Sequence, residues 1–377
     1  MEALTKTLHP THALISLGAF RHNFAVVRDL VGAKVKVMAV VKSNAYGHGV
    51  KILAREAVLC GAEYLAVARV DEGCELRKEG IDRPTLVFEL APEHQILQAL
   101  ENELDLTVAT LSSAQRVNEA ARRLQKKGRI HIKFDTGMGR LGPPFQEAAS
   151  LIVETARLNW IDLVGVYSHF ATSDEADQTY AHEQLNRFED VLSALERAKI
   201  EVPLKHMANS GAIMTLPHSH FDMVRPGIML YGFTPRKGMT VESRLKPVMS
   251  LRSCVSFMKT VKTGSSVSYG RRFIAGKETR IATVPIGYAD GYARNLTNKS
   301  FVLIRGKRYP VVGTVCMDHL MVDVGFDANI QEGDPVTLIG RDGEESVSGW
   351  ELSEHLGTIP YEITCMVSAR VPRVTVE

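Results

Sequence analysis

Short apolar runs alternate with helical patterns between Val35 and Arg225, and this alternation restricts the fold more than any other feature. Stretches between the runs carry apolar residues at helical spacing, for example Val50, Leu53, Ala54 and Ala57. This order predicts a parallel (β/α)₈ TIM-like barrel. A doubly wound open sheet is the alternative, but no GxGxxG follows the first run. The eight runs are Val35–Val41, Tyr64–Ala68, Thr85–Leu90, Leu104–Ala109, Ile130–Phe134, Leu163–Tyr167, Leu204–Ala208 and Met223–Arg225.

The pattern changes near residue 240, where Pro235 to Met239 read as a loop. Long helical patterns are absent beyond it, apart from one short helix predicted from Ser348 to Leu356, with Gly357 as its end signal. We therefore expect a barrel over residues 1–240 and a β-rich domain over residues 241–377. The barrel is preceded by a short strand (Thr11–Leu17) and a helix (Gly18–Leu30). The strands predicted in the second domain are Met249–Val261, Arg280–Pro285, Phe301–Arg305, Val311–Cys316, Leu320–Val324 and Pro335–Ile339.

Composition excludes several classes of protein. The 377 residues carry a net charge of +2, which gives no indication of binding to nucleic acid or to a membrane surface. No apolar run approaches the length of a membrane span, and the N-terminus lacks the apolar segment of a signal peptide. Five cysteines without a CxxC pair argue against a disulfide framework and against a zinc site. We expect the protein to be in a reducing cytoplasm and to bind no metal.

Lys42 stands directly after the first apolar run, in the stretch Val41 to Gly49. Burying an unpaired ammonium is costly, and desolvation lowers the pKa of a lysine. Such an amine is suited to attack a carbonyl or to hold one as a Schiff base. The alternative is a lysine that extends from the strand end into water.

Polar residues also follow the later runs, where a parallel barrel carries its catalytic groups. A reactive lysine with two arginines (Arg140 and Arg225) and the amide pair of Gly227 and Ile228 indicates an anionic carbonyl cofactor. Hydroxyl groups such as those of Ser210 and Tyr46 suit a phosphate. This description fits pyridoxal 5′-phosphate. An arginine facing the pyridine nitrogen would keep that nitrogen unprotonated, which favours reprotonation of the same carbon.

Eight segments, in order and over nearly the whole chain, resemble the alanine racemases. They are VVKSNAYGHG, KFDTGMGRLG, YSHFATSDE, HMANSGA, VRPGIMLYG, VSYGRRF, PIGYADGYAR and GTVCMDHLMVDV. The resemblance implies a fold-type III enzyme that uses pyridoxal 5′-phosphate and works as a head-to-tail homodimer with sites shared between subunits. It implies interconversion of L-alanine and D-alanine by two bases, supplying D-alanine for peptidoglycan.

The resemblance also assigns roles to single residues. Lys42 resembles the Schiff-base lysine and the base on the D-face, and Tyr269 resembles the opposite base, supplied by the partner subunit. Arg225 resembles the partner of the pyridine nitrogen, and His169 a member of its hydrogen-bond network. Arg140 resembles the residue that binds the cofactor's phenolic oxygen and the substrate carboxylate. The remaining matches are the cofactor positions Tyr46, Asn209, Ser210, Gly227, Ile228 and Tyr361, and the substrate-carboxylate positions Met317 and Asp318.

Two points stay open within this assignment. A tyrosine with a pKa of about 10 needs a group that stabilises its phenolate. His169 and His206 are both candidates from their spacing, and the family pattern favours His169. Lys133 resembles a lysine that is carbamylated in many members, where the added charge orients the arginine that matches Arg140.

Two other functions are alternatives to a racemase, and the sequence argues against both. A non-catalytic carrier of pyridoxal phosphate would lack the second domain and Tyr269. A decarboxylase of basic amino acids would need a Cys-Asp pair, whereas Cys316 is followed by Met317 and then Asp318. Serine and other small amino acids remain alternative substrates.

Overall fold

The computed structural model describes residues 9–326 and 329–377, and these form two compact units. One unit contains Phe20–Ala45 and Val50–Lys246. The other contains the residues through Ala19, the short segment Tyr46–Gly49, and Pro247–Glu377. This differs from the expected division after residue 240, because the first strand and a piece of the loop after Lys42 belong with the C-terminal residues.

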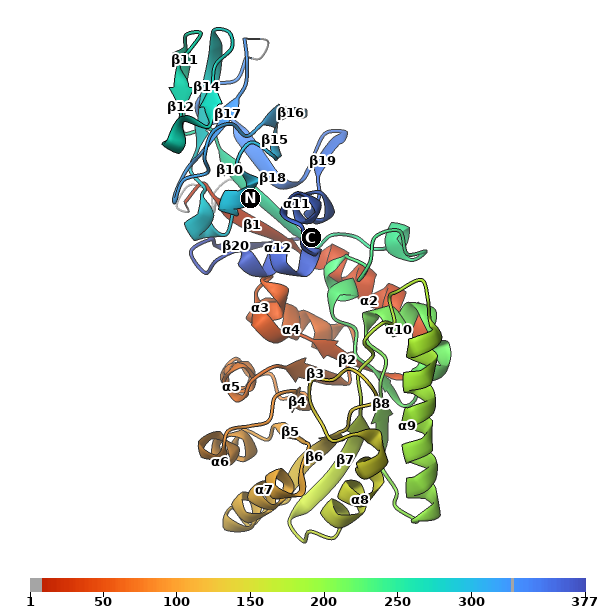
Figure 1. The fold of residues 1–377 in the computed structure, drawn as a ribbon. Coiled ribbons are helices and arrows are strands. Elements are labelled where there is room, and N and C mark those ends of the chain that lie inside the picture. Colours follow the sequence, from red (N-terminus) through yellow and green to blue (C-terminus); the bar gives the residue numbers. More distant parts are fainter. Residues whose placement is uncertain (1–8, 327–328) are drawn as a thin grey trace. The chain divides into compact units, whose positions relative to one another are not determined.

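The first unit is a barrel of parallel strands, as Figure 1 shows in orange to green. Its eight strands pair in sequence order, and the last one, β9, pairs with the first, β2. Backbone hydrogen bonds from Asp222 N to Lys205 O (3.1 Å) and from Arg225 N to Ala208 O (2.9 Å) join β9 to β8 and close the barrel. The prediction of a TIM-like barrel is confirmed. The strands are β2 (Lys36–Val40), β3 (Tyr64–Val67), β4 (Thr85–Val87), β5 (Asp105–Val108), β6 (Gly128–Lys133), β7 (Ile161–Tyr167), β8 (Leu204–His206) and β9 (Met223–Val224).

Helices between the strands pack an apolar face against the barrel. In α7, for example, Ala114, Val117 and Ala121 are buried, and Thr110 caps the helix by accepting a hydrogen bond from Ser113 N (3.1 Å). Within the part of the chain that the structure describes, none of the helices has the length and apolar character needed to cross a membrane. The helices up to β9 are α2 (Leu17–Val31), α3 (Lys42–Tyr46), α4 (Val50–Leu59), α5 (Val70–Lys78), α6 (Glu93–Glu101), α7 (Leu111–Arg123), α8 (Phe145–Ala156), α9 (Thr179–Arg197) and α10 (Ser210–Thr215).

The second unit is mostly β, as predicted. Its main sheet has the order β16-β15-β18-β10-β1-β20, with β19 paired to β18, and two smaller sheets have the orders β11-β14-β17 and β12-β13. The first strand of the chain therefore lies between strands from its C-terminal part. The elements are β1 (His12–Ser16), β10 (Met249–Cys254), β11 (Phe257–Val261), β12 (Ser266–Val267), β13 (Phe273–Ile274), β14 (Thr279–Val284), β15 (Phe301–Ile304), β16 (Lys307–Pro310), β17 (Leu320–Asp323), β18 (Pro335–Asp342), β19 (Glu345–Val347), β20 (Arg373–Val376), α11 (Gly349–Leu356) and α12 (Pro360–Met366).

The second domain differs from the prediction in several details, and the strands β12, β13, β16, β19 and β20 were not predicted. The run Met249–Val261 is two strands in different sheets, because Val255 N still bonds Asp334 O beside β18 whereas Ser256 N bonds Thr283 O in β14. The run Val311–Cys316 makes only an isolated bridge at Val311, and Gly313 interrupts it with a φ of +73°. A second helix, α12, was not predicted, whereas α11 has the predicted serine cap and ends at Gly357 (φ +69°).

Candidate functional site

A left-handed turn follows β2 and begins beside Lys42. Ser43, Asn44 and Ala45 have φ and ψ near +50°, and Tyr46 also has a positive φ. This conformation costs about 1 kcal/mol or more for each residue with a β-carbon. Hydrogen bonds from Ser43 N to Glu72 Oε1 (2.7 Å) and from Val50 N to Asn44 Oδ1 (2.8 Å) hold the turn. The half-buried Lys42 is thus presented at the carboxyl end of β2 by a fixed backbone.

Strand register places three further polar residues side by side at the same end of the barrel. Lys133 pairs with Tyr167 across β6 and β7, and Tyr167 pairs with His206 across β7 and β8. The rings of Tyr167 and His206 stack with their centroids 4.9 Å apart. Lys133 Nζ lies 5.2 Å from the tyrosine ring centroid, and the guanidinium carbon of Arg225 lies 5.3 Å from it. The Tyr167 ring therefore contacts both Lys133 and Arg225.

Arg225 is the most extensively bonded of these residues. It is 4% exposed and donates to His206 Nδ1 (2.8 Å) and to His169 Nδ1 (3.3 Å). It also donates to the carbonyl oxygens of Ser168 (2.7 Å) and Met207 (3.0 Å). Both candidate histidines thus contact this arginine. Burial lowers its pKa to about 10, so the guanidinium stays charged at neutral pH.

The charges at this end of the barrel are mainly positive and close enough to affect one another. Burial, followed by the charges of Arg225 and Arg140, lowers the pKa of Lys133 to about 7. Burial and the charges of Arg225, Lys133, Arg140 and Lys42 hold the pKa of His169 well below its ordinary value. His169 is consequently neutral. The cluster of Lys42, Lys133, Arg140 and Arg225 is an environment that attracts an anionic ligand.

The loop after β6 carries Arg140. Asp135 shapes this loop, because its carboxylate accepts backbone hydrogen bonds from Gly137 (2.8 Å), Met138 (2.8 Å) and Gly139 (2.7 Å). These bonds fix the turn that leads to the exposed Arg140. The loop therefore presents an exposed cationic side chain on a hydrogen-bonded turn.

Ser210 and Asn209 lie at the start of α10. The buried Ser210 Oγ accepts a hydrogen bond from Gly227 N (2.9 Å), which brings this hydroxyl next to the amides that open the 3₁₀ turn η2 (Ile228–Tyr231). Asn209 Oδ1 caps α10 at Ala212 N (3.0 Å) and accepts from Ser173 Oγ (2.8 Å). Hydroxyl and amide donors gathered in this way suit a phosphate group.

In the second unit, Tyr46 and Tyr361 contact each other. Their ring centroids are 5.9 Å apart, and burial raises the pKa of Tyr46 above its ordinary value. Arg373 holds the same segment by donating two hydrogen bonds to Gly47 O (3.0 and 2.8 Å). The two predicted phosphate-binding tyrosines therefore form one patch.

Tyr269 lies on a turn whose backbone is fixed although its side chain is 72% exposed. Ser268 and Gly270 on either side have positive φ values of 65° and 69°. Thr314 Oγ1 donates to Tyr269 O (2.6 Å), and Ser268 Oγ donates to Thr314 O (2.6 Å). A large aromatic side chain held out by an ordered turn is typical of a binding surface.

Met317 and Asp318 occupy a neighbouring loop of the second unit. The Met317 side chain is 52% exposed, and its carbonyl oxygen accepts from Ala289 N (3.0 Å). The Asp318 carboxylate pairs with Arg370 (2.8 Å), which also reaches Asp290 (3.4 Å). These bonds direct the carboxylate of Asp318 to an arginine of its own unit.

The structure thus brings together the predicted barrel residues Lys42, Lys133, Arg140, His169 and Arg225, whereas Tyr269, Met317 and Asp318 belong to the other unit. Sequence reasoning did not single out Tyr167 or the loop-shaping Asp135. Both stand at the carboxyl end of predicted strands, and that position was the signal available for finding them.

Comparisons with known proteins agree over nearly the whole chain. Residues 15–235 match a family described as "Alanine racemase, N-terminal domain", and residues 248–375 match "Alanine racemase, C-terminal domain". "Alanine racemase 2" of Caldanaerobacter subterraneus subsp. tengcongensis is 44% identical over 368 residues, covering 97% of this chain and 95% of that protein. The alanine racemase of Methanococcus maripaludis is 45% identical over 368 residues, covering 97% and 98%. A solved structure of alanine racemase from Clostridium difficile 630 has a TM-score of 0.94 at 39% identity, covering 98% of this chain and 96% of that one.

Proposed function

The chain belongs to the alanine racemase family, and on that premise we propose that it interconverts L-alanine and D-alanine by a two-base mechanism with pyridoxal 5′-phosphate. The main support for binding of this cofactor is the cationic cluster around the buried Arg225, which includes Lys42. When bound, pyridoxal phosphate withdraws electrons and so acidifies the hydrogen on the α-carbon of an amino acid.

The residues at the barrel end fit this cofactor. Lys42 supplies the amine that would hold its aldehyde, and Ser210 with the amides of Gly227 and Ile228 would hold its phosphate. Arg225 would donate to its ring nitrogen, and Arg140 would bind its phenolic oxygen. In the second unit, Tyr46 and Tyr361 would complete the phosphate site. Asn209 is also proposed to bind the cofactor, and its Oδ1 caps α10 and so helps to place Ser210.

Two bases are needed because racemisation removes a proton from one face of the α-carbon and delivers one to the other. Lys42 serves the D-face and Tyr269, from the partner subunit, serves the L-face. His169 couples to this pair through Arg225. Arg140 and the backbone at Met317 would bind the substrate carboxylate, and Asp318 would place Met317 through its bond to Arg370.

Membership of the alanine racemase family supports a proposal for the assembly of the protein, its location and the use of its product. We propose that the protein is a cytoplasmic homodimer and that its D-alanine is used for peptidoglycan. The pocket is proposed for alanine, with serine as the main competitor to be tested.

The decisive experiment combines a spectrum with an assay. Wild-type protein with added pyridoxal phosphate should show the visible absorption of a lysine-bound cofactor and should racemise alanine faster than serine, lysine or arginine. Lys42→Ala should lose the absorption band and lower the rate by about a thousandfold or more. The control is Lys51→Ala, which removes an exposed lysine paired with Glu79 (2.7 Å) and should change neither property. An unchanged spectrum in Lys42→Ala would remove the cofactor from this account.

A further inference from the structure

A row of buried, hydrogen-bonded side chains runs through the barrel from Arg225 to the amino end of β5. His206 Nδ1 lies 2.8 Å from Arg225 Nη1, and His206 Nε2 lies 2.9 Å from His131 Nδ1. His131 Nε2 lies 3.3 Å from Asp105 Oδ2. Asp105, His131 and His206 are each 0% exposed. Because Asp105 begins β5 and Arg225 follows β9, the row connects the two ends of the barrel.

The two ends of the row determine every proton position within it. A guanidinium can only donate and an ionised carboxylate can only accept. Since Arg225 donates to His206 Nδ1, the proton of His206 must be on Nε2 and is donated to His131 Nδ1. The proton of His131 is then on Nε2 and is donated to Asp105. Both imidazoles are therefore neutral, each as a single tautomer.

Charge and burial at each end support this assignment. Burial, followed by the charge of Arg225, holds the pKa of His206 well below its ordinary value. Burial opposes ionisation of Asp105, but hydrogen bonds from His131 and Arg129 outweigh it and hold the pKa of that carboxyl below its ordinary value.

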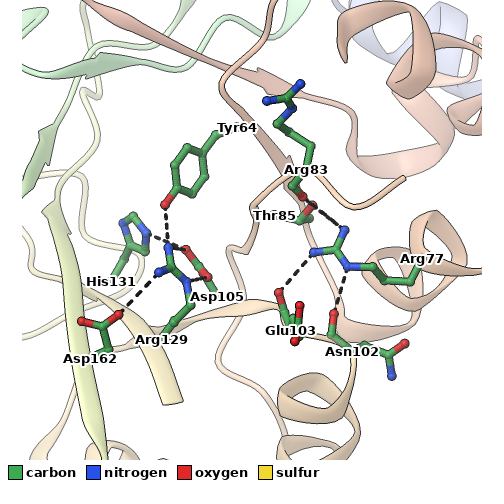
Figure 2. A network of polar contacts seen from close by, with 10 residues as sticks. All are labelled: Tyr64, Arg77, Arg83, Thr85, Asn102, Glu103, Asp105, Arg129, His131 and Asp162. Atoms are coloured by element: carbon green, nitrogen blue, oxygen red, sulfur yellow. Dashed lines mark hydrogen bonds and ion pairs between the residues drawn. The ribbon is translucent and has the colours of Figure 1, made fainter. Parts of the chain in front are cut away.

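The far end of the row is held by several polar contacts, which Figure 2 shows. Arg129 Nε donates to Asp105 Oδ1 (2.7 Å), and its Nη2 reaches Asp105 Oδ2 (3.2 Å) and Tyr64 Oη (2.9 Å). Asp162 also pairs with Arg129 (3.4 Å). The Asp105 carboxylate is thereby fixed in the orientation that presents one oxygen to His131.

Space for the row is provided by a glycine. Gly165 pairs with His131 across β6 and β7, and a β-carbon at this position would lie 2.5 Å from His131 Nδ1. That nitrogen is the acceptor for His206. A side chain at residue 165 would thus occupy the place of the histidine–histidine hydrogen bond.

Arg225 is a buried cation, and the row of side chains helps to stabilise its charge. Its partners in the described residues are two carbonyl oxygens and two imidazole nitrogens, and no ion pair to a carboxylate is formed. A buried charge without an ionic partner is costly. Hydrogen bonds in series polarise one another, so a carboxylate at the end of the row makes His206 Nδ1 a stronger acceptor.

We propose that Asp105 and His131 are positioning residues for Arg225, acting through His206 to fix the tautomer that accepts from the guanidinium. This inference rests on the proposed function only in that Arg225 is taken as the cofactor's ring-nitrogen partner. Asp105 then acts on the reaction without touching cofactor or substrate.

The test uses Asp105→Asn with Thr85→Val as the matched control. Thr85 is also buried at the amino end of a barrel strand, where its hydroxyl donates to Arg83 O (2.8 Å), but it is outside the row. Nitrogen NMR of histidine-labelled protein without cofactor should show His206 as one neutral tautomer in wild type and in Thr85→Val. Asp105→Asn should give a mixture of tautomers. His206 is assigned from the signal lost in His206→Gln.

Kinetics provide the second readout. Asp105→Asn should lower kcat for alanine by about tenfold to a hundredfold with little change in KM, as is usual for a residue that orients a ligand-binding group. Thr85→Val should keep the kcat of the wild type, even if its thermal stability falls as much as that of Asp105→Asn. If Asp105→Asn does not fold, His131→Gln breaks the row one residue closer to Arg225. It should likewise give a mixture of His206 tautomers and a lower kcat.

The proposal is overturned if Asp105→Asn leaves both the His206 tautomer and kcat as they are in Thr85→Val. Failure of the proposed function has a different signature. In that case wild-type protein would bind no pyridoxal phosphate or racemise no alanine, whereas the NMR signal of the row in the cofactor-free protein would be unaffected.

Discussion

At the scale of single residues, Lys133 is a lysine whose surroundings favour the neutral amine. It is 4% exposed, and burial together with two neighbouring arginines lowers its pKa to about 7. Carbamylation requires a neutral amine, and an ordinary lysine is almost fully protonated at neutral pH. The geometry therefore supports the proposal that Lys133 is carbamylated, because the added negative charge would lie among cations.

This proposal predicts a modification that depends on pH. Protein equilibrated with ¹³C-labelled carbon dioxide should give a carbamate NMR signal at about pH 8 that weakens towards about pH 6, because the amine becomes protonated as the pH falls through its pKa. Lys133→Arg should lack the signal and should lower kcat by about tenfold, since the charge that orients Arg140 is lost. Lys51→Arg is the control. A signal that persists in Lys133→Arg would assign the carbamate to another lysine.

Sequence reasoning singled out Lys42 because it follows an apolar run and Arg225 because it ends one. Lys133 lies inside a run and was singled out through the family resemblance, and the roles of all three residues stay predictions. Asp105 and His131 lie within apolar runs, where a polar residue reads as a packing detail. Their importance depends on partners 26 and 75 positions away, and one sequence does not report such contacts.

At the scale of elements, the turn after Lys42 shows that local conformational preference does not always predict the backbone conformation. Ser43, Asn44 and Ala45 carry β-carbons yet adopt left-handed conformations, which local preference disfavours. Tertiary hydrogen bonds impose this conformation, and no local signal announces it. The eight barrel strands were predictable, by contrast, because strands buried on both faces are continuous apolar runs. The run Val311–Cys316 was wrongly predicted to be a strand, because its pairing stops after the bridge at Val311, where Gly313 interrupts the extended backbone.

Gly47, which ends this turn, gives a prediction at the same scale. It has a φ of +83°, and a β-carbon would lie 2.0 Å from the backbone oxygen of Thr364 in α12. Gly47→Ala should lower the free energy of unfolding by about 3 kcal/mol or more and weaken binding of pyridoxal phosphate, because Tyr46 and Tyr361 would be displaced. Gly32→Ala is the control, since Gly32 has a φ of +76° but nothing within 4 Å of the added carbon. Its cost should be about 1 kcal/mol.

Urea denaturation of Gly47→Ala and Gly32→Ala measures the loss in free energy of unfolding for each variant. Equal destabilisation would show that backbone strain, rather than contact with α12, decides the effect at Gly47.

At the scale of the whole molecule, the chain order does not follow the compact units. Strand β1 comes first in the sequence but pairs with β10 and β20, and Tyr46–Gly49 belong with the C-terminal residues. A boundary drawn from the sequence at one position cannot describe this division. The periodicity of a short strand such as β1 is the same in either unit, so only its partners decide where it belongs.

The proposed sharing of sites between subunits makes a prediction about mixed dimers. Lys42 belongs to one compact unit and the exposed Tyr269 to the other. If each site takes Lys42 from one subunit and Tyr269 from its partner, a dimer of one Lys42→Ala chain and one Tyr269→Phe chain has both lesions in one site and none in the other. Such a dimer, purified through two different tags, should have about half of the wild-type activity per dimer.

Sites built within single chains give a different result, because each site of the mixed dimer would then carry one lesion. The activity would fall to that of the two homodimeric variants. A dimer of one Lys42→Ala chain and one wild-type chain is the control, since it has one intact site under either arrangement and should also have about half of the wild-type activity. The control therefore measures the activity of one intact site in a dimer. The mixed dimer then shows whether Tyr269 acts in the partner's site or in its own.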